Sequence, residues 1–167
     1  TALAFGQGAV FGGSQRIDTA GSLASTTSGT LSVVANLDLV QGTYAHLWNG
    51  NITNNRSALI SYGSSKNIWL VSGVAHDSGI AVTTGWAVIT YVFATSTTWE
   101  ARWDGAAVTG LACEAGAINA SYVGSYANAA NGNGISGTIA SVVCAAAADA
   151  SIHTLHRAWA AQRYGVP

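Results

Sequence analysis

The stretch WAVITYVFATSTTWEARWDG, residues 86–105, is the part of this chain that says most about its architecture. In WAVITYVFA (86–94), both alternating sets of side chains are largely apolar, which is typical of a strand buried on both faces inside a double sheet. In TWEARW (98–103), apolar and charged residues alternate, so only one face of the strand is buried. Asp104 and Gly105 follow, and this pair predicts a two-residue hairpin turn of type I′, in which both central residues have positive φ.

Strand-like runs separated by polar turns extend in both directions from this hairpin. They are TLSVVANLDLV (30–40), YAHLWNGN (44–51), SALISYG (57–63), NIWLVSG (67–73), GLAC (110–113), ASYVGSY (120–126) and GTIASVVCA (137–145). Even spacing of short strands predicts a sandwich or a barrel. Because no linker and no internal repeat interrupts the series, we expect a single domain over residues 1–167.

The chain ends in a segment of a different kind. Ile152, Leu155 and Trp159 recur at spacings of three and four residues among several alanines. This pattern predicts an amphipathic helix over about residues 149–164. We expect these three side chains to form the stripe that docks the helix on the strands.

Composition limits the partners of the chain. Charged residues make up 8% of the sequence, against about 25% in an average soluble domain, and the net charge is −1. Scattered basic residues provide no electrostatic footprint for nucleic acid and no polybasic patch for a membrane, so we expect neither partner. Weak repulsion between copies favours a place in a larger assembly, a homo-oligomer included. Cys113 and Cys144 lie in apolar contexts, and either one disulfide or two buried thiols fits them.

Taken in order, the segments resemble the laminin-G-like domains of phage and bacterial surface proteins, within the concanavalin A-like lectin and glucanase superfamily. The segments that carry the resemblance are TLSVVANLDL (30–39), GWAVITYVF (85–93), WEARWDG (99–105), SYVGSY (121–126), ISGTIASVVCA (135–145) and the closing AAADASIHTLHRAWAAQRYGV (146–166). The resemblance implies an all-β fold, a two-sheet antiparallel jelly-roll sandwich with a short C-terminal α-helix.

The resemblance also implies a function. We expect a non-catalytic attachment or structural module of a virion, such as a tail fibre, receptor-binding or capsid-decorating protein. Such a module binds a surface glycan or neighbouring subunits and is located on a virion or an extracellular surface.

The alternative is a divergent glycan-cleaving enzyme, a glycanase or a lyase, on the same fold. Glycoside hydrolysis uses a pair of carboxylates across one sugar, and the glucanases of this superfamily carry a Glu-x-Asp-x-x-Glu array. Nothing in this sequence matches that array: Glu100 and Asp104 divide between a strand face and a turn, and Glu114 stands alone. We therefore expect no enzymatic activity.

Aromatic residues beside amides are the strongest signal for a ligand. Trp48 lies at a strand end in HLWNGN, Tyr122 precedes the Gly/Asn-rich segment GSYANAANGNGISG (124–137), and Tyr126 lies near its start. An aromatic ring stacks on the C–H groups of a sugar while amides bond its hydroxyls, in line with the general pattern of an apolar site with few polar groups. The predicted glycan-binding residues are Trp48, Asn49, Asn51, Tyr122, Tyr126 and Asn128. The alternative for Trp48 is that it fills the core, as large aromatics do.

No cofactor is predicted, and calcium is the only metal with a candidate ligand. The resemblance brings in calcium sites built from loop aspartates, which makes Asp77 in VAHDSG (74–79) a weak candidate, with Asp38 a second. Calcium needs six to eight oxygen ligands, and these two residues supply few of them. His153 and His156 have a spacing that suits a metal, but we expect them on the exposed surface of the closing helix.

Overall fold

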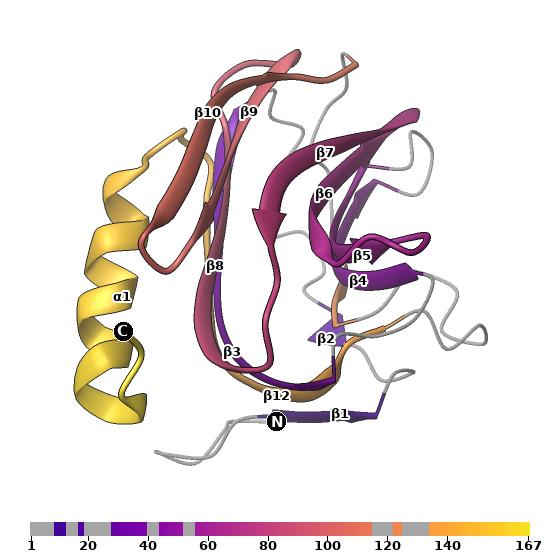
Figure 1. Ribbon diagram of the computed structural model, residues 1–167. Coiled ribbons are helices and arrows are strands. Elements are labelled where there is room, and N and C mark those ends of the chain that lie inside the picture. Colours follow the sequence, from indigo (N-terminus) through magenta and orange to yellow (C-terminus); the bar gives the residue numbers. More distant parts are fainter. Residues whose placement is uncertain are drawn as a thin grey trace.

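A computed structural model describes residues 9–12, 17–18, 28–39, 44–51, 56–114, 122–124 and 134–167. Two antiparallel sheets face each other, and one helix lies outside the first of them (Figure 1). The first sheet has the order β1 (Ala9–Gly12), β12 (Ser136–Ala145), β3 (Gly29–Leu39), β8 (Gly85–Phe93), β9 (Thr98–Trp103) and β10 (Ala106–Ala112). The second has the order β2 (Ile17–Asp18), β11 (Tyr122–Val123), β4 (Tyr44–Asn51), β5 (Arg56–Tyr62), β6 (Asn67–Ser72) and β7 (Val74–Ala81).

The predicted two-sheet antiparallel sandwich with a short C-terminal helix is confirmed. The helix, α1, spans Ser151–Tyr164 and ends at Gly165, whose φ of 68° is left-handed. Within the described ranges, no helix is long and apolar enough to cross a lipid bilayer. Both cysteines are free thiols, Cys113 buried and Cys144 half-buried, so the reading as two thiols holds.

Strand β8 is buried on both faces, as its sequence predicts. Ala87, Ile89 and Phe93 belong to the core between the sheets, whereas Val88 belongs to a second apolar cluster beneath α1. Tyr91 also faces the other sheet, and its hydroxyl donates a hydrogen bond across the core to the Leu59 carbonyl oxygen at 2.7 Å.

The hairpin between β9 and β10 has the predicted two-residue loop but a different turn type. Trp103 pairs with Ala106, so Asp104 and Gly105 form the loop. Of the two loop residues only Asp104, at φ 47°, has a positive φ, whereas a type I′ turn needs both, so the type I′ prediction is wrong. The Asp104 carboxylate accepts a hydrogen bond from the Val88 N–H at 2.9 Å, and the Asp104 N–H donates to the Val88 carbonyl. These two bonds hold the turn against β8.

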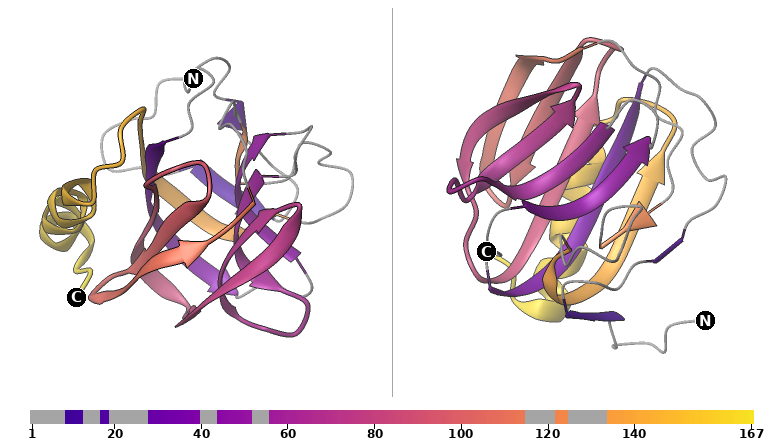
Figure 2. Two further views of the ribbon diagram at one scale, coloured as in Figure 1. Left: turned by 90° about the horizontal axis from the view of Figure 1, so that it is seen from above. Right: turned by 90° about the vertical axis from the view of Figure 1, so that its right-hand side faces the viewer.

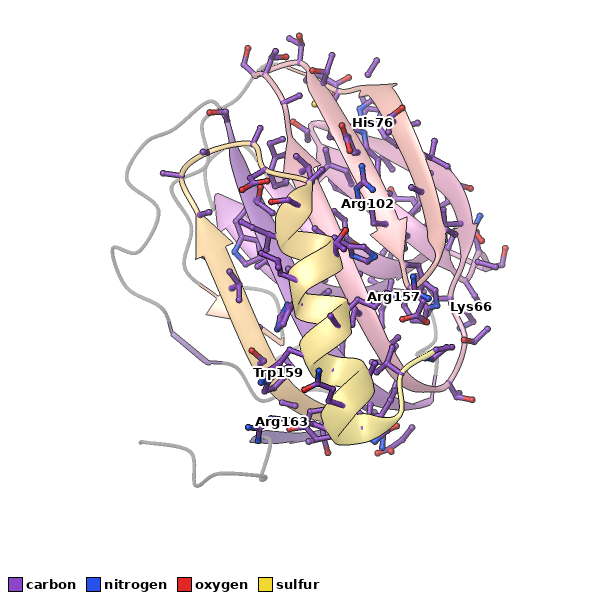
Figure 3. The ribbon with its side chains drawn as sticks, turned by 90° about the vertical axis from the view of Figure 1, so that its left-hand side faces the viewer. Lys66, His76, Arg102, Arg157, Trp159 and Arg163 are labelled. Atoms are coloured by element: carbon purple, nitrogen blue, oxygen red, sulfur yellow. The ribbon has the colours of Figure 1, made fainter. Side chains whose placement is uncertain are left out.

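The face through which α1 docks is not the one that the apolar spacing predicts. The buried residues of the helix are His153, His156 and Ala160, whereas Leu155 is 69% exposed. The expectation that the two histidines lie on the exposed surface is therefore wrong. Trp159 is half-buried at the side of this interface, where it packs on the apolar cluster and contacts the Arg163 guanidinium (Figure 3).

A chain of buried hydrogen bonds explains why histidines occupy this face. His153 Nε2 lies 2.7 Å from the Asp104 carbonyl oxygen, which only accepts, so Nε2 carries the proton. In the neutral ring Nδ1 then accepts from the Thr90 hydroxyl at 2.9 Å, and the Thr90 oxygen accepts from Ser32 at 2.7 Å. The Ser32 oxygen in turn accepts from His156 Nδ1 at 2.8 Å. Burial lowers the pKa of both imidazoles and so favours the neutral rings to which these tautomers belong. In that state the rings satisfy the hydroxyls that the sheet presents to the helix.

The assigned docking face of the helix can be tested by changing the size of one buried and one exposed side chain. Ala160→Leu adds volume where the helix meets the sheet and is expected to lower the free energy of unfolding by about 1–3 kcal/mol. Leu155→Ala is expected to change it by less than about 0.5 kcal/mol, because that side chain is exposed. Urea unfolding of the two variants measures both values, and a larger loss in Leu155→Ala would contradict the assigned face.

Candidate glycan-binding face

The two outer faces of the sandwich differ in what covers them. Helix α1 packs on β3 and β8 of the first sheet, on the side away from the second sheet (Figure 2). In the part of the chain that the structure describes, no helix lies against the outer face of the second sheet. No described helix thus covers β4, β5, β6 and β7, although Ser57 and Leu59, which pair with Val71 and Trp69, are each only 1% exposed.

Trp48 does not belong to that surface. The side chain is 1% exposed, and its ring lies 5.9 Å from that of Phe93 in the core between the sheets. The register of β4 against β5 shifts between His46 and Trp48, so Leu47 and Trp48 both reach the core. The prediction that Trp48 stacks on a sugar is corrected, because a ring inside the core is closed to a ligand.

The backbone brings two of the predicted residues together. Tyr122 of β11 stands directly opposite Asn49 of β4, and Asn51 pairs with Arg56 at the end of the same strand. Tyr126 and Asn128 lie outside the described residues. The pairing places Asn49 and Tyr122 on neighbouring strands of the second sheet.

Three aromatic side chains that the sequence analysis did not select lie on the outer face of the second sheet. Ile68 and Leu70 belong to the core, so Trp69 between them faces outward, and by the same alternation Tyr44 faces away from Ala45. The Tyr62 ring lies 5.1 Å from that of Tyr44 and 5.2 Å from that of Trp69. We call Tyr44, Tyr62 and Trp69 the aromatic row; Tyr44 is 38% exposed, and the other two are half-buried.

A polar pair borders the aromatic row. Asp77 stands opposite Trp69 in the β6–β7 ladder. The Asn67 amide nitrogen donates to both oxygens of the Asp77 carboxylate, at 3.0 and 2.9 Å, and the Gly79 N–H donates to Oδ1 at 2.8 Å. We call Asn67 and Asp77 the acceptor pair. The carboxylate that was the calcium candidate is thus held by three N–H contacts.

The two aspartates considered for calcium lie on different sheets. Asp77 is on β7 of the second sheet and Asp38 is on β3 of the first. Among the described residues, no group of three or more His, Cys, Asp and Glu side chains is placed to hold a metal ion. A calcium role for Asp77 stays a prediction.

The carboxylates considered for catalysis have their own partners. The Glu100 carboxylate lies 2.8 Å from the Arg102 guanidinium on the first sheet. The Glu114 carboxylate lies 2.7 Å from His76 Nε2, and this hydrogen bond lowers the pKa of Glu114. Since Glu114 follows β10 and His76 lies on β7, this pair ties the two sheets together at one edge.

Comparison with known proteins finds similarity in fold and none in sequence families. No family model matches the sequence, and no curated protein matches it. Among solved structures, domain 4 of AbnA, a GH43 extracellular arabinanase from Geobacillus stearothermophilus, superposes with a TM-score of 0.68 at 15% identity, over 90% of this chain and 76% of that domain. That domain was solved in complex with arabinotriose.

A second similar structure is the leech intramolecular trans-sialidase complexed with 2,7-anhydro-Neu5Ac, with a TM-score of 0.53 and 15% identity. The match covers 91% of this chain but only 27% of that protein. At these identities the two likenesses establish the β-sandwich fold alone.

Proposed function

We propose that this domain is a non-catalytic glycan-binding module whose ligand lies against the aromatic row. The observation that carries the proposal is the contact of Tyr44, Tyr62 and Trp69 on an outer sheet face next to the acceptor pair. Aromatic rings provide the apolar surface on which sugar C–H groups stack, and the polar pair provides hydrogen bonds for hydroxyls. The arabinotriose in the similar arabinanase domain supports the same class of ligand.

The setting that we propose is attachment at the surface of a virion or a cell. The resemblance to laminin-G-like domains and the composition, with 8% charged residues, both favour it. Binding to neighbouring subunits is the rival within this setting, because a surface with little charge also suits packing between copies.

Removal of Trp69 tests the proposal. Trp69→Ala is expected to weaken glycan binding at least tenfold, equivalent to about 1.4 kcal/mol, because it deletes the ring of the row that stands next to Asp77 of the acceptor pair. Isothermal titration with arabinotriose and other neutral oligosaccharides measures the affinity. Leu155→Ala, on the helix outside the first sheet, is the matched control and is expected to bind as the wild type does.

The possible results separate the functions. Equal affinities of Trp69→Ala and wild type would place the ligand elsewhere. If the wild type binds no sugar at millimolar concentration and forms a defined oligomer in light scattering, packing between subunits replaces glycan binding. New reducing ends or unsaturated products in the same mixtures would show an enzyme.

A further inference from the structure

We infer that the site on the second sheet takes a neutral sugar through its hydroxyl hydrogens, with the acceptor pair as the recognising group. This inference rests on the proposed function and adds the chemical class of the ligand. It is carried by the arrangement of Asn67, Asp77 and Gly79 next to Trp69.

The first step is the hydrogen-bonding capacity of the pair. A carboxylate has about four acceptor positions on its two oxygens. Oδ1 of Asp77 accepts from Asn67 and from Gly79, whereas Oδ2 accepts from Asn67 alone among the described residues. Oδ2 therefore retains an acceptor position for a ligand.

The second acceptor is the amide oxygen of Asn67. The carboxylate of Asp77 requires a donor opposite it, which assigns the amide nitrogen to that side and leaves the oxygen on the other. No hydrogen bond to this oxygen is present among the described residues. The pair thus offers two acceptors side by side, and a sugar with neighbouring hydroxyls supplies the two donors that they need.

The third step is pre-organisation. Three N–H contacts fix the Asp77 carboxylate before any ligand arrives. Little side-chain freedom remains to be lost on binding, which favours affinity. A carboxylate held in this way also repels a ligand that carries its own carboxylate, since like charges in contact are unfavourable. This is the reason for expecting neutral sugars rather than uronic or sialic acids.

The fourth step is space. Tyr62 packs against Trp69 from β5, whereas the neighbouring edge strand β7 presents short residues on the same outer face. Gly79 and Ala81 are exposed, and a Cβ added at Gly79 meets no atom within 4 Å. Asp77 is the residue of β7 directly beside Trp69, and the room for a sugar ring lies next to it, over Gly79 and Ala81 on the side of Asn67.

The experiment compares neutral and acidic oligosaccharides on four proteins. Xylotetraose, cellotetraose, mannotetraose and trigalacturonic acid are titrated into the wild type, Asp77→Asn, the exchanged pair Asn67→Asp/Asp77→Asn, and Asp38→Asn. The exchanged pair keeps the net charge and an Asn–Asp contact but moves the carboxylate from β7 to β6. Asp38→Asn removes one exposed carboxylate from the first sheet and is the control for net charge.

We expect at least one neutral tetrasaccharide to bind the wild type tenfold or more tightly than trigalacturonic acid does. Asp77→Asn and the exchanged pair are expected to lose that affinity at least fivefold, and Asp38→Asn to keep it. Thermal melting shows that each variant is folded. Equal binding of neutral and acidic sugars, or undiminished binding by folded Asp77→Asn, overturns the inference and leaves glycan binding standing. If the wild type binds none of these sugars and no arabinotriose, the proposed function is overturned instead.

Discussion

Gly137→Ala is expected to lower the free energy of unfolding by at least about 3 kcal/mol, enough to unfold much of a marginally stable domain. Gly137 lies in β12 between β1 and β3, where the β12–β3 register shifts. Its φ of 138° is one that side chains rarely adopt, and a Cβ there would lie 2.0 Å from the Asn36 carbonyl oxygen. The clashing atom belongs to the backbone of a buried strand, so neither a rotamer change nor a small shift relieves it.

Urea unfolding measures this loss, with Gly63→Ala as the matched control. Gly63 also has a left-handed φ, 60°, but a Cβ there meets no atom within 4 Å. Replacing Gly63 by alanine is expected to lower the free energy of unfolding by about 1–2 kcal/mol, which is the cost of the left-handed backbone conformation without any clash. Equal losses in the two variants would mean that the close approach to Asn36 is not what requires glycine at Gly137.

Acid is expected to destabilise the domain through the buried histidines. Desolvation lowers the pKa of His156 from 6.5 to about 4 and also lowers the pKa of His153. Since the folded pKa is below the unfolded one, the neutral rings stabilise the fold fully above pH 6.5, and this contribution is lost as the pH falls towards 4. At about 1.4 kcal/mol per pKa unit, the contribution of His156 over this window is about 2–3 kcal/mol.

Charged groups near His153 modify this effect, whose direction is set by desolvation. The positive charges of Arg102 and Arg157 further disfavour protonation of His153, whereas Asp104 favours it. Desolvation raises the pKa of Asp104 itself, and its protonation partly offsets the loss at the acid end of the window. Since neutral His156 already donates from Nδ1 to Ser32, the chain of hydrogen bonds is broken by protonation of His153. Its Nδ1 then donates to Thr90, and one hydroxyl proton of the Ser32–Thr90 pair is left without an acceptor in the chain.

Urea unfolding at several pH values between 7.5 and 4.5 tests this prediction in the wild type and in His156→Leu. The leucine variant is expected to show a flatter dependence of unfolding free energy on pH, because one titrating group is gone. A residual slope remains from His153 and from His46, whose pKa burial lowers to about 4 in the second sheet. An unchanged slope in His156→Leu would contradict the lowered pKa of His156.

Alternation along the strands predicted the sandwich because it is a local property. The two apolar faces of β8 and the single apolar face of β9 follow from residues two apart in the chain. The same alternation in NIWLVS points Trp69 away from the core, and this signal was available for the aromatic row. The alternation does not specify which strands lie side by side. It therefore does not predict which outward-facing aromatic residues contact one another.

The docking face of the helix and the residues of the candidate site could not be predicted from local sequence patterns. The spacing of Ile152, Leu155 and Trp159 predicts the helix but not the face through which it docks. The sheet beneath the helix presents the hydroxyls of Ser32 and Thr90, which form hydrogen bonds with imidazoles, while Leu155 stays exposed. The existence and order of the strands and the helix were readable from the chain because they depend on neighbours within a few residues. Bulges and long-range packing assigned the faces: the register shift in β4 turned Trp48 into the core, and three adjacent strands assembled Tyr44, Tyr62 and Trp69 outside it.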